Sequence, residues 1–292
     1  MQIITDPTAM QRISEDLRMK HQLIAVVMTM GALHEGHISL VREAKKQAGT
    51  VILTIFVNPS QFGPSEDFHR YPRPFDKDAA MAKSAGVDYL FAPEPDLIYP
   101  EGFQTSVATG SVAERFEGAL RPGHFNGVAT VVLKLMMLTR PHLAIFGQKD
   151  AQQLAVLRTM VRDLNLNVRI LEAPIIREHD GLAVSSRNMY LSTSQRELAP
   201  LLYKTLTETA ARLAENSENY KEILDASKER LSSIPAMNVE YLAIVDRDTF
   251  VETRPDNDPC RCLLIGAVRL GGTRLLDNVQ LPPRKTAEDG GA

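Results

Sequence analysis

Two histidines three residues apart, His34 and His37, stand where an apolar run gives way to a helical pattern. Residues 23–28 are strand-like, Gly31 lies in the turn that follows, and the apolar positions from Ile38 onward share one helical face. A strand that enters a helix through a glycine-containing turn presents backbone N–H groups and a positive dipole end to an anion. Two imidazoles at that turn add donors that can carry positive charge, so the segment is suited to the phosphates of a nucleotide.

Two other interpretations of these histidines stay open at this point. They can be solvated residues at the start of a surface helix, or they can be a metal-binding pair. The metal-binding spacing H-E-x-x-H is one residue longer than His34-Glu35-Gly36-His37, which also has a glycine inside. The sequence contains no G-x-x-x-x-G-K-[ST] motif, so a phosphate site here would not be a P-loop.

Three further polar clusters each follow a strand-like run: 58–62 after 51–57, 147–153 after 142–146, and 177–188 after 168–176. Each has a local alternative, namely a turn at 58–59, an ion pair at 149–150, and N-cap positions at 185–186. Ligands of an open parallel sheet bind beyond the carboxyl ends of its strands, so the four clusters are expected to converge on one site. Their combined imidazoles, lysine, arginine and hydroxyls suit a polyphosphate.

The elements that must position these clusters alternate between strand and helix over the first 177 residues. This alternation predicts an α/β fold with a doubly wound, parallel, Rossmann-like sheet. The predicted strands are 23–28, 51–57, 89–92, 142–146 and 168–176, and the predicted helices are 36–47, 74–84, 128–139 and 151–164. Helix 128–139 is apolar on nearly every side, so we expect it to be deeply buried.

After about residue 177 the pattern changes. Helical segments at 194–215 and 220–232 precede strand-like runs at 239–245, 263–268 and 274–276. Short turns such as Leu270-Gly271-Gly272-Thr273 indicate antiparallel pairing in a smaller α+β C-terminal domain. We therefore expect a nucleotide-binding domain over 1–177, a small second domain over 178–281 and a disordered tail over 282–292.

Composition narrows the classes of partner and the compartment. The chain has 292 residues, of which 44% are hydrophobic and 24% charged, with a net charge of −3. This balance predicts neither a nucleic-acid nor a membrane partner, and no apolar run or N-terminal segment resembles a membrane span or a signal sequence. The two cysteines, Cys260 and Cys262, would point to opposite faces of a strand, so we expect no bridge and a cytoplasmic location.

The chain resembles the pantoate–β-alanine ligase (pantothenate synthetase) family, of the HxGH nucleotidyl transferase superfamily, from Ile3 to about residue 281. The HxGH turn marks only the superfamily, whereas Gln152-Gln153 together with Ser185-Ser186-Arg187-Asn188 is far more specific. The matching blocks are residues 29–37, 55–62, 71–73, 121–125, 146–150, 152–154, 180–188 and 275–278.

The resemblance implies a two-step ligation that makes pantothenate, a precursor of coenzyme A. Pantoate's carboxylate attacks the α-phosphate of ATP to give pantoyl adenylate and pyrophosphate, and the amine of β-alanine then displaces AMP. It further implies Mg²⁺ bound with the nucleotide, a homodimer, and a C-terminal domain that acts as a lid. No protein ligand of Mg²⁺ can be named, although Asp76 and Asp78 are candidates near the flap.

Residue roles follow from the matched blocks. Catalytic groups would be His34, His37, Lys149, Ser185, Ser186 and Arg187. The nucleotide would be bound by Met30, Gly31, Ala32, Leu33, His34, Glu35, Gly36, His37, Gly147, Gln148, Lys149, Asp150, Ile176, Val184, Ser185, Ser186 and Arg187. Pantoate would be bound by Gln61, Gln153, Met30 and Phe56, with Tyr71 on a flap that closes over the intermediate.

The chain departs from the family pattern at Met28, Gln148, Ala151 and Val184, where proline, glutamate, an aromatic residue, and methionine or leucine are usual. Proline would stiffen the turn before Thr29, so Met28 is expected to loosen the backbone that meets the nucleotide. Two rival functions therefore stay open. One is a nucleotidyl transferase for another small acid or phosphate, and the other is a nucleotide-binding regulatory module without turnover.

Overall fold

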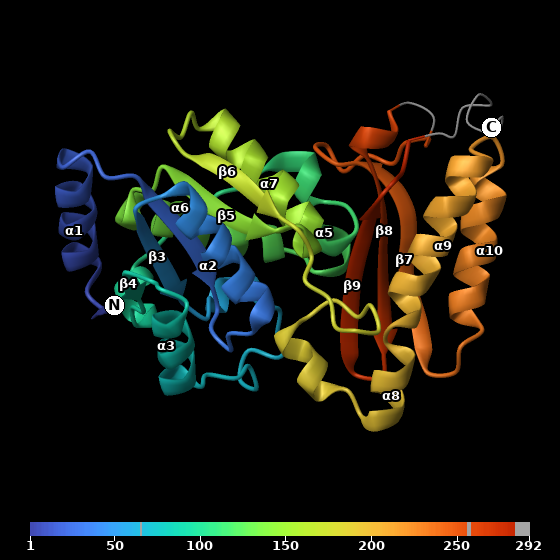
Figure 1. The fold of residues 1–292 in the computed structure, drawn as a ribbon, viewed down its shortest axis with the longest axis horizontal. Coiled ribbons are helices and arrows are strands. Elements are labelled where there is room, and N and C mark those ends of the chain that lie inside the picture. The colour runs from blue at the N-terminus through green and yellow to red at the C-terminus, as the bar shows by residue number, and fades with distance from the viewer. Residues whose placement is uncertain (65, 256–257, 284–292) are drawn as a thin grey trace. The chain divides into compact units, whose positions relative to one another are not determined.

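The computed structural model describes residues 1–64, 66–255 and 258–283, and Figure 1 shows its fold. The chain separates into two compact units. The first comprises Met1–Gln148 and Gln152–Ile176, and the second comprises Lys149–Ala151 and the described residues from Arg177 onward. The predicted class is confirmed, because a parallel sheet with helices is followed by a smaller antiparallel sheet.

The sheet of the first unit has six parallel strands in the order β1-β4-β3-β2-β5-β6. The central strand β2 pairs with β3 on one side and β5 on the other. The chain therefore reverses its direction across the sheet at β2, which creates the switch point where open α/β sheets bind ligands. The strands are β1 (Gln2–Ile4), β2 (Ile24–Thr29), β3 (Thr50–Ile55), β4 (Tyr89–Phe91), β5 (Leu143–Gly147) and β6 (Arg169–Ala173).

All four predicted helices of this unit are present, with shifted ends. They are α2 (Glu35–Gln47), α3 (Phe75–Ser84), α6 (His124–Thr139) and α7 (Ala151–Asp163). Two short helices, α4 (Pro95–Ile98) and α5 (Glu117–Leu120), lie between β4 and α6 in the chain. Helix α2 packs Leu40, Val41 and Ala44 into one core cluster with residues of β2 and β3. Helix α6 buries ten of its residues, as its uniformly apolar sequence predicts.

Two elements at the N-terminus have no counterpart among the predictions, namely β1 and α1 (Pro7–Met19). The start of α1 has a recognisable signal, since the Asp6 carboxylate accepts hydrogen bonds from the backbone N–H groups of Thr8 and Ala9 and Pro7 occupies the first helical position. Helix α1 is amphipathic and packs against α6.

The second unit is a three-stranded antiparallel sheet, β7 (Met237–Asp246), β8 (Cys262–Leu270) and β9 (Thr273–Gln280), packed on helices. The single helix predicted over 194–215 is wrong. The structure has α8 (Thr193–Leu198) and α9 (Leu201–Glu215) instead, because Pro200 has no N–H to continue the first helix. Helix α10 (Tyr220–Ser232) ends as predicted.

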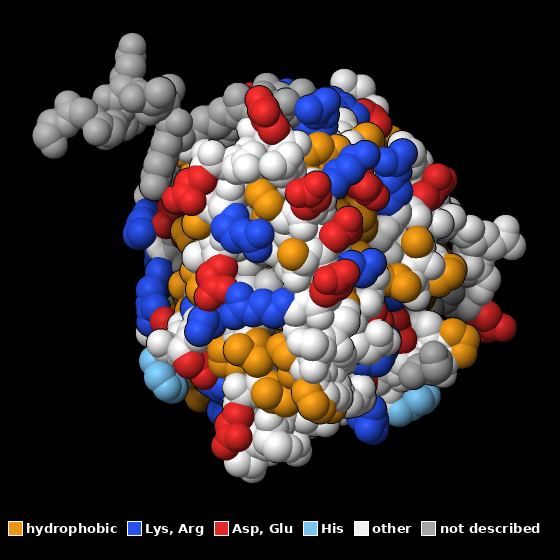
Figure 2. All heavy atoms as spheres, turned by 90° about the vertical axis from the view of Figure 1, so that its right-hand side faces the viewer, with side chains coloured by type: hydrophobic (Ala, Val, Ile, Leu, Met, Phe, Trp, Pro, Cys, Tyr) orange, Lys and Arg blue, Asp and Glu red, His pale blue; other side chains and the backbone are white. Residues whose placement is uncertain are grey.

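The surface of the second unit carries interspersed charge. In Figure 2, basic and acidic side chains alternate over the visible face with small groups of hydrophobic side chains between them. One exposed ion pair joins Arg230 of α10 to Glu208 of α9, and exposed pairs of this kind contribute about 0–1 kcal/mol. Among the described residues, no helix combines the length and the apolarity that a bilayer crossing requires. Residues 284–292 of the predicted disordered tail lie outside the described residues.

Candidate active site

The turn between β2 and α2 is held by a buried carboxylate from another helix. Asp78 of α3 is only 1% exposed, and its two oxygens accept the backbone N–H groups of Ala32 (2.8 Å) and Leu33 (2.7 Å). Gly31 has φ +83°, and a Cβ there would lie 3.0 Å from an Asp78 oxygen, so only glycine allows this approach. Burial raises the pKa of Asp78, while these two hydrogen bonds oppose the shift.

The amides of this turn differ from the expectation that they face an anion. The N–H of Gly31 donates to Thr29 Oγ1 (3.1 Å), and those of Ala32 and Leu33 are taken by Asp78. In the first turn of α2, the N–H groups of Glu35 and Gly36 have no protein acceptor among the described residues. A phosphate would therefore meet the helix start itself and not the glycine turn.

His34 and His37 stack on one another, with ring centroids 4.0 Å apart. The backbone N–H of His34 donates to His37 Nδ1 at 3.4 Å. A neutral imidazole that accepts at Nδ1 carries its proton at Nε2, so His37 offers an N–H donor there even when it is uncharged. The spacing of the two histidines is one residue shorter than in H-E-x-x-H. Among the described residues, they belong to no group of three or more His, Cys, Asp or Glu side chains that could hold a metal ion.

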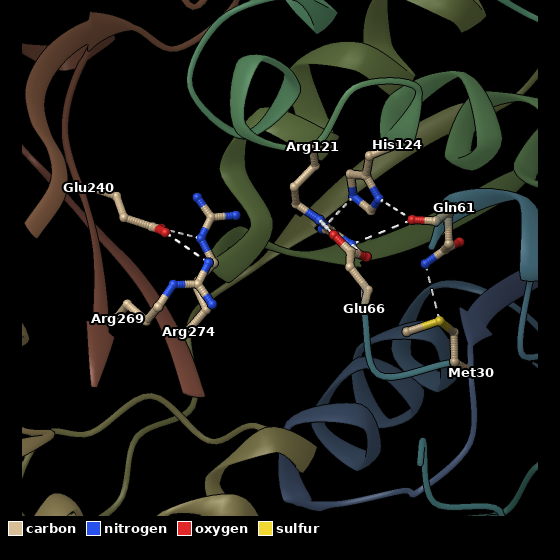
Figure 3. Close-up of polar contacts among 8 residues, drawn as sticks. All are labelled: Met30, Gln61, Glu66, Arg121, His124, Glu240, Arg269 and Arg274. Atoms are coloured by element: carbon tan, nitrogen blue, oxygen red, sulfur yellow. Dashed lines mark hydrogen bonds and ion pairs between the residues drawn. The ribbon is translucent and has the colours of Figure 1, made fainter. Parts of the chain in front are cut away.

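Gln61 follows β3, and its main-chain carbonyl accepts a hydrogen bond from a histidine of α6 (Figure 3). His124 on α6 lies 2.8 Å from the Gln61 carbonyl oxygen through Nδ1, and its Nε2 lies 2.9 Å from Arg121. Arginine only donates, so Nε2 accepts and Nδ1 carries the proton that bonds to Gln61. The side-chain nitrogen of Gln61 donates to the sulfur of Met30 at 3.1 Å, which joins two of the predicted substrate-binding residues.

Arg121 also forms a bidentate ion pair with Glu66, with N–O distances of 2.6 and 2.7 Å (Figure 3). Burial raises the pKa of Glu66, but the hydrogen bonds and charge of Arg121 outweigh it and hold the pKa below its usual range. The sequence block 121–125 matched the family without any role for its members. Arg121 and His124 are thus polar groups beside the candidate site that sequence reasoning left unassigned.

Aromatic contacts within the first unit hold together the segment around Tyr71, which is predicted to be a flap. Phe62 packs edge-on against Phe68 (5.4 Å between centroids) and against the buried Tyr71 (6.0 Å). The guanidinium of Arg73 lies 5.2 Å from the centre of the Phe68 ring. Phe56, the other predicted apolar contact of pantoate, is buried at the end of β3 and its N–H donates to the carbonyl of Thr29.

The two neighbouring glutamines at the start of α7 have different roles. Gln152 is buried and its amide binds backbone groups of Val112, Arg115 and Glu117, so it is a structural residue. Gln153 is half-buried and its amide has no protein partner among the described residues. Because α7 follows β5, the neighbour of β2 in the sheet, Gln153 lies at the same sheet edge as the start of α2.

In the second unit, Ser185 caps the 3-10 turn η4 (Ser186–Tyr190) by accepting the N–H of Arg187 at 3.3 Å. Asn188 donates to the carbonyl of Ala183 at 3.0 Å, which closes the loop. Lys149 lies beside this loop, and its Nζ is 3.6 Å from the exposed carboxylate of Asp150, a weak ion pair. Residues Lys149, Ser185, Asn188 and others line a small cavity of about 20 Å³, which is room for one water.

The loop is anchored from its start by Arg177, which pairs with both oxygens of Asp277 (2.6 and 2.8 Å) and lies 3.5 Å above the Tyr203 ring. The next residue, Asn278, donates to the carbonyl of Lys149 at 3.1 Å. Asp277 and Asn278 belong to the matched block 275–278. On the same sheet, Glu240 binds Arg269 and Arg274, which are directly opposite each other on β8 and β9 (Figure 3).

The first unit thus brings together Met30, His34, His37, Phe56 and Gln61 around the carboxyl ends of β2 and β3, and the second unit brings together Lys149 and Ser185–Asn188. Gly147, Gln148 and Ile176 lie at the ends of β5 and after β6. Of the two magnesium candidates, Asp76 is exposed on the first turn of α3, whereas both oxygens of Asp78 are engaged by backbone.

Comparison with known proteins shows the family of this chain. The sequence model of the family described as pantoate-beta-alanine ligase matches residues 2–280. The chain belongs to this family. It is 59% identical over 278 residues to the pantothenate synthetase of Chlorobium phaeobacteroides strain BS1, a match that covers 95% of this chain and 96% of the relative.

Solved structures of pantothenate synthetases share the fold over nearly the whole chain. The enzyme from Thermus thermophilus has a TM-score of 0.89 at 42% identity, covering 97% of this chain and 100% of that one. The pantoate–β-alanine ligase from Francisella tularensis, described as complexed with beta-gamma ATP and beta-alanine, has a TM-score of 0.79 at 33% identity and covers 96% and 97% of the two chains.

Proposed function

We propose that this chain is an ATP-dependent ligase that joins pantoate to β-alanine through a pantoyl adenylate, releasing AMP and pyrophosphate. The observation that carries the proposal is the family match over residues 2–280, at 59% identity to a pantothenate synthetase. The Francisella relative, by its description, holds an ATP analogue and β-alanine. The organised turn at the start of α2 supports the nucleotide part independently, since it leaves two helix-start amides for phosphates beside the imidazoles of His34 and His37.

Adenylation explains why such a site needs no covalent nucleophile. A free carboxylate resists attack by an amine because oxide would have to leave, whereas an acyl adenylate loses AMP. The first step transfers an adenylyl group to the pantoate carboxylate, and charge builds on the α-phosphate and on the departing pyrophosphate. Catalysis is then mainly positioning and charge stabilisation.

The roles of the protein groups follow from this charge. His37 Nε2, His34 and the N–H groups of Glu35 and Gly36 stabilise the phosphates from the first unit. Lys149 and the loop residues Ser185, Ser186 and Arg187 supply cationic and hydroxyl donors from the second unit, which acts as a lid. Asp150 binds the ribose hydroxyls. Mg²⁺ bound with the nucleotide would supply charge that neutralises phosphate oxygens.

Pantoate is bound by amide groups of Gln61 and Gln153, because its hydroxyls and carboxylate need such partners, and its dimethyl carbon packs on Met30 and Phe56. The flap residue Tyr71 keeps the reactive adenylate from water. We further propose a cytoplasmic homodimer. The free thiols of Cys260 and Cys262 fit a reducing compartment, and light scattering should give twice the 32.4 kDa chain mass.

The decisive test is product analysis with pantoate, β-alanine and Mg-ATP. The chain should release AMP and pyrophosphate in equal amounts, and pyrophosphate exchange into ATP should require pantoate but not β-alanine. Appearance of ADP would contradict the adenylate route. ATP binding by calorimetry without pyrophosphate release would favour a regulatory module, the alternative that Met28 keeps open.

Replacing Gln61 or Gln153 by alanine tests the identity of the acid. Each change should raise the KM for pantoate about tenfold or more while the KM for ATP stays within about twofold, because each removes polar partners of a buried substrate group. Initial-rate kinetics with each substrate varied in turn measure this. Gln47→Ala, an exposed glutamine on α2, is the matched control. Equal effects on both KM values would contradict a selective role of these glutamines in binding pantoate.

A further inference from the structure

Asn58, directly after β3, has a side chain whose orientation is fixed by backbone groups. It is 1% exposed. Its Nδ2 donates to the carbonyl of Gly127 at 3.1 Å, and its Oδ1 accepts the backbone N–H of Ser60 at 3.3 Å. A carbonyl can only accept and an N–H can only donate, so the two ends of this amide cannot be exchanged.

This orientation determines that of Gln61. Asn58 Nδ2 also lies 3.1 Å from Gln61 Oε1, and since Nδ2 donates, Gln61 must present its oxygen to Asn58. The Gln61 nitrogen then faces the other way, where one N–H meets the Met30 sulfur at 3.1 Å (Figure 3). Its second N–H has no protein acceptor among the described residues.

Tyr99 completes the arrangement from a distant part of the chain. Its hydroxyl donates to Asn58 Oδ1 at 2.9 Å and lies 3.1 Å from Ser60 Oγ, which itself donates to the same oxygen at 2.8 Å. Tyr99 directly follows α4, and its backbone N–H donates to the carbonyl of Pro95 at 2.8 Å, so its backbone is held at the end of this helix.

The surroundings of Tyr99 keep its hydroxyl protonated, so that it can donate a hydrogen bond. The ring packs against Phe56 (6.1 Å between centroids) and Phe103 (5.1 Å). Lys134 of α6 lies 4.3 Å from the Phe103 ring centre and 5.7 Å from that of Tyr99. Burial raises the pKa of Tyr99, although the Ser60 hydroxyl opposes this, so the phenol stays protonated at neutral pH.

We propose that Tyr99 is a positioning residue for the acid substrate: by donating to Asn58 Oδ1 it holds firmly the orientation that backbone groups give to Asn58, and so keeps an N–H of the Gln61 amide, and not its carbonyl, facing the substrate. An N–H selects an acceptor, which in pantoate is a carboxylate or hydroxyl oxygen. The inference rests on the proposed function, and it adds a residue outside every sequence block that matched the family. Tyr99 contacts Asn58, which in turn contacts Gln61, so its proposed role is to position Gln61 and not to take part in the chemistry.

Tyr99→Phe removes the hydroxyl and keeps the ring contacts. We expect the KM for pantoate to rise about 5- to 20-fold, because Asn58 Oδ1 loses a buried donor and the Gln61 amide is held less firmly. The KM values for ATP and β-alanine and the melting temperature should stay near those of the parent. Tyr89→Phe, on β4, is the matched control, since no hydrogen bond of the Tyr89 hydroxyl is found among the described residues.

Two further variants separate positioning from general structure. In a Gln61→Ala background, Tyr99→Phe should have no further effect on the KM for pantoate, because the group it positions is gone. Asn58→Asp replaces the Nδ2 donor by an acceptor, so it should turn the Gln61 amide round and raise the KM for pantoate more than Tyr99→Phe does.

The outcomes are distinct. A pantoate-selective rise that disappears in the Gln61→Ala background supports the inference. A Tyr99→Phe variant that behaves like Tyr89→Phe, or that raises all three KM values together with a lower melting temperature, overturns it while leaving the proposed function intact. If Gln61→Ala itself leaves the KM for pantoate unchanged, the pantoate site of the proposed function fails and the inference fails with it.

Discussion

His37→Asn should lower the rate of adenylate formation by about two to three orders of magnitude without unfolding the protein. Loss of one preorganised donor that stabilises developing negative charge typically has an effect of this size. His37 Nδ1 accepts the N–H of His34, so the proton of the neutral ring is on Nε2. Asparagine reproduces the acceptor position of Nδ1 but has no atom at Nε2, so it removes the donor and keeps the contact within the turn.

Two companion variants make this experiment specific. His37→Ala removes both functions and should lose the same rate together with some thermal stability. His37→Gln places an amide N–H nearer to the position of Nε2 and should recover part of the rate that asparagine loses. The measurement is pyrophosphate release in a single turnover with saturating pantoate and ATP, beside thermal melting of each variant. A His37→Asn rate within about threefold of the parent would remove His37 from the chemistry.

The position of the candidate site residues at the ends of β2, β3 and β5 could be predicted because parallel strands impose a common edge on whatever follows them. Gly31, His34, Gln61 and Gln153 each come within a few residues of a strand end, and apolar runs reveal those ends directly. The antiparallel hairpin at Gly271, which has φ +59°, could be predicted from its short glycine-containing turn.

The partners that hold the site could not be predicted, because they come from remote elements with ordinary local sequence. Asp78 lies 45 residues beyond Leu33 and looks like one more acidic residue in the first turn of a helix. The Arg121–Glu66 pair joins positions 55 residues apart. Pro200 is visible in the sequence, but the apolar spacing on either side of it continues in phase, so the spacing does not reveal the break between α8 and α9.

Gly127 shows how closely these remote elements fit. A Cβ at this position on α6 would lie 2.3 Å from the carbonyl oxygen of Ser60 and 2.8 Å from the backbone nitrogen of Gln61. Backbone atoms cannot turn aside as a side chain can, so glycine is required for α6 to reach the turn after β3. The same contact brings the Gly127 carbonyl within reach of Asn58.

Asp78→Ala should have the second largest effect, and on stability as well as on activity. It leaves the N–H groups of Ala32 and Leu33 buried without an acceptor. Each such group costs about 1–3 kcal/mol, so the free energy of unfolding should fall by about 2–5 kcal/mol. The turn at Gly31 and Ala32, both with positive φ, would lose the group that holds it, and the KM for ATP should rise about tenfold or more.

Comparison of Asp78→Asn with Asp76→Ala distinguishes holding the turn from binding magnesium. Asparagine keeps one acceptor but turns a second donor toward a backbone N–H, so it should also destabilise the protein, whereas Asp76 is exposed and its removal should not. Urea unfolding and ATP titration of the three variants measure both effects. If Asp78 were instead a magnesium ligand, its loss would leave unfolding unchanged and excess Mg²⁺ would restore activity. The burial of Asp78, which is 1% exposed, favours the first result, since Mg²⁺ usually keeps several waters and a buried carboxylate offers no room for them.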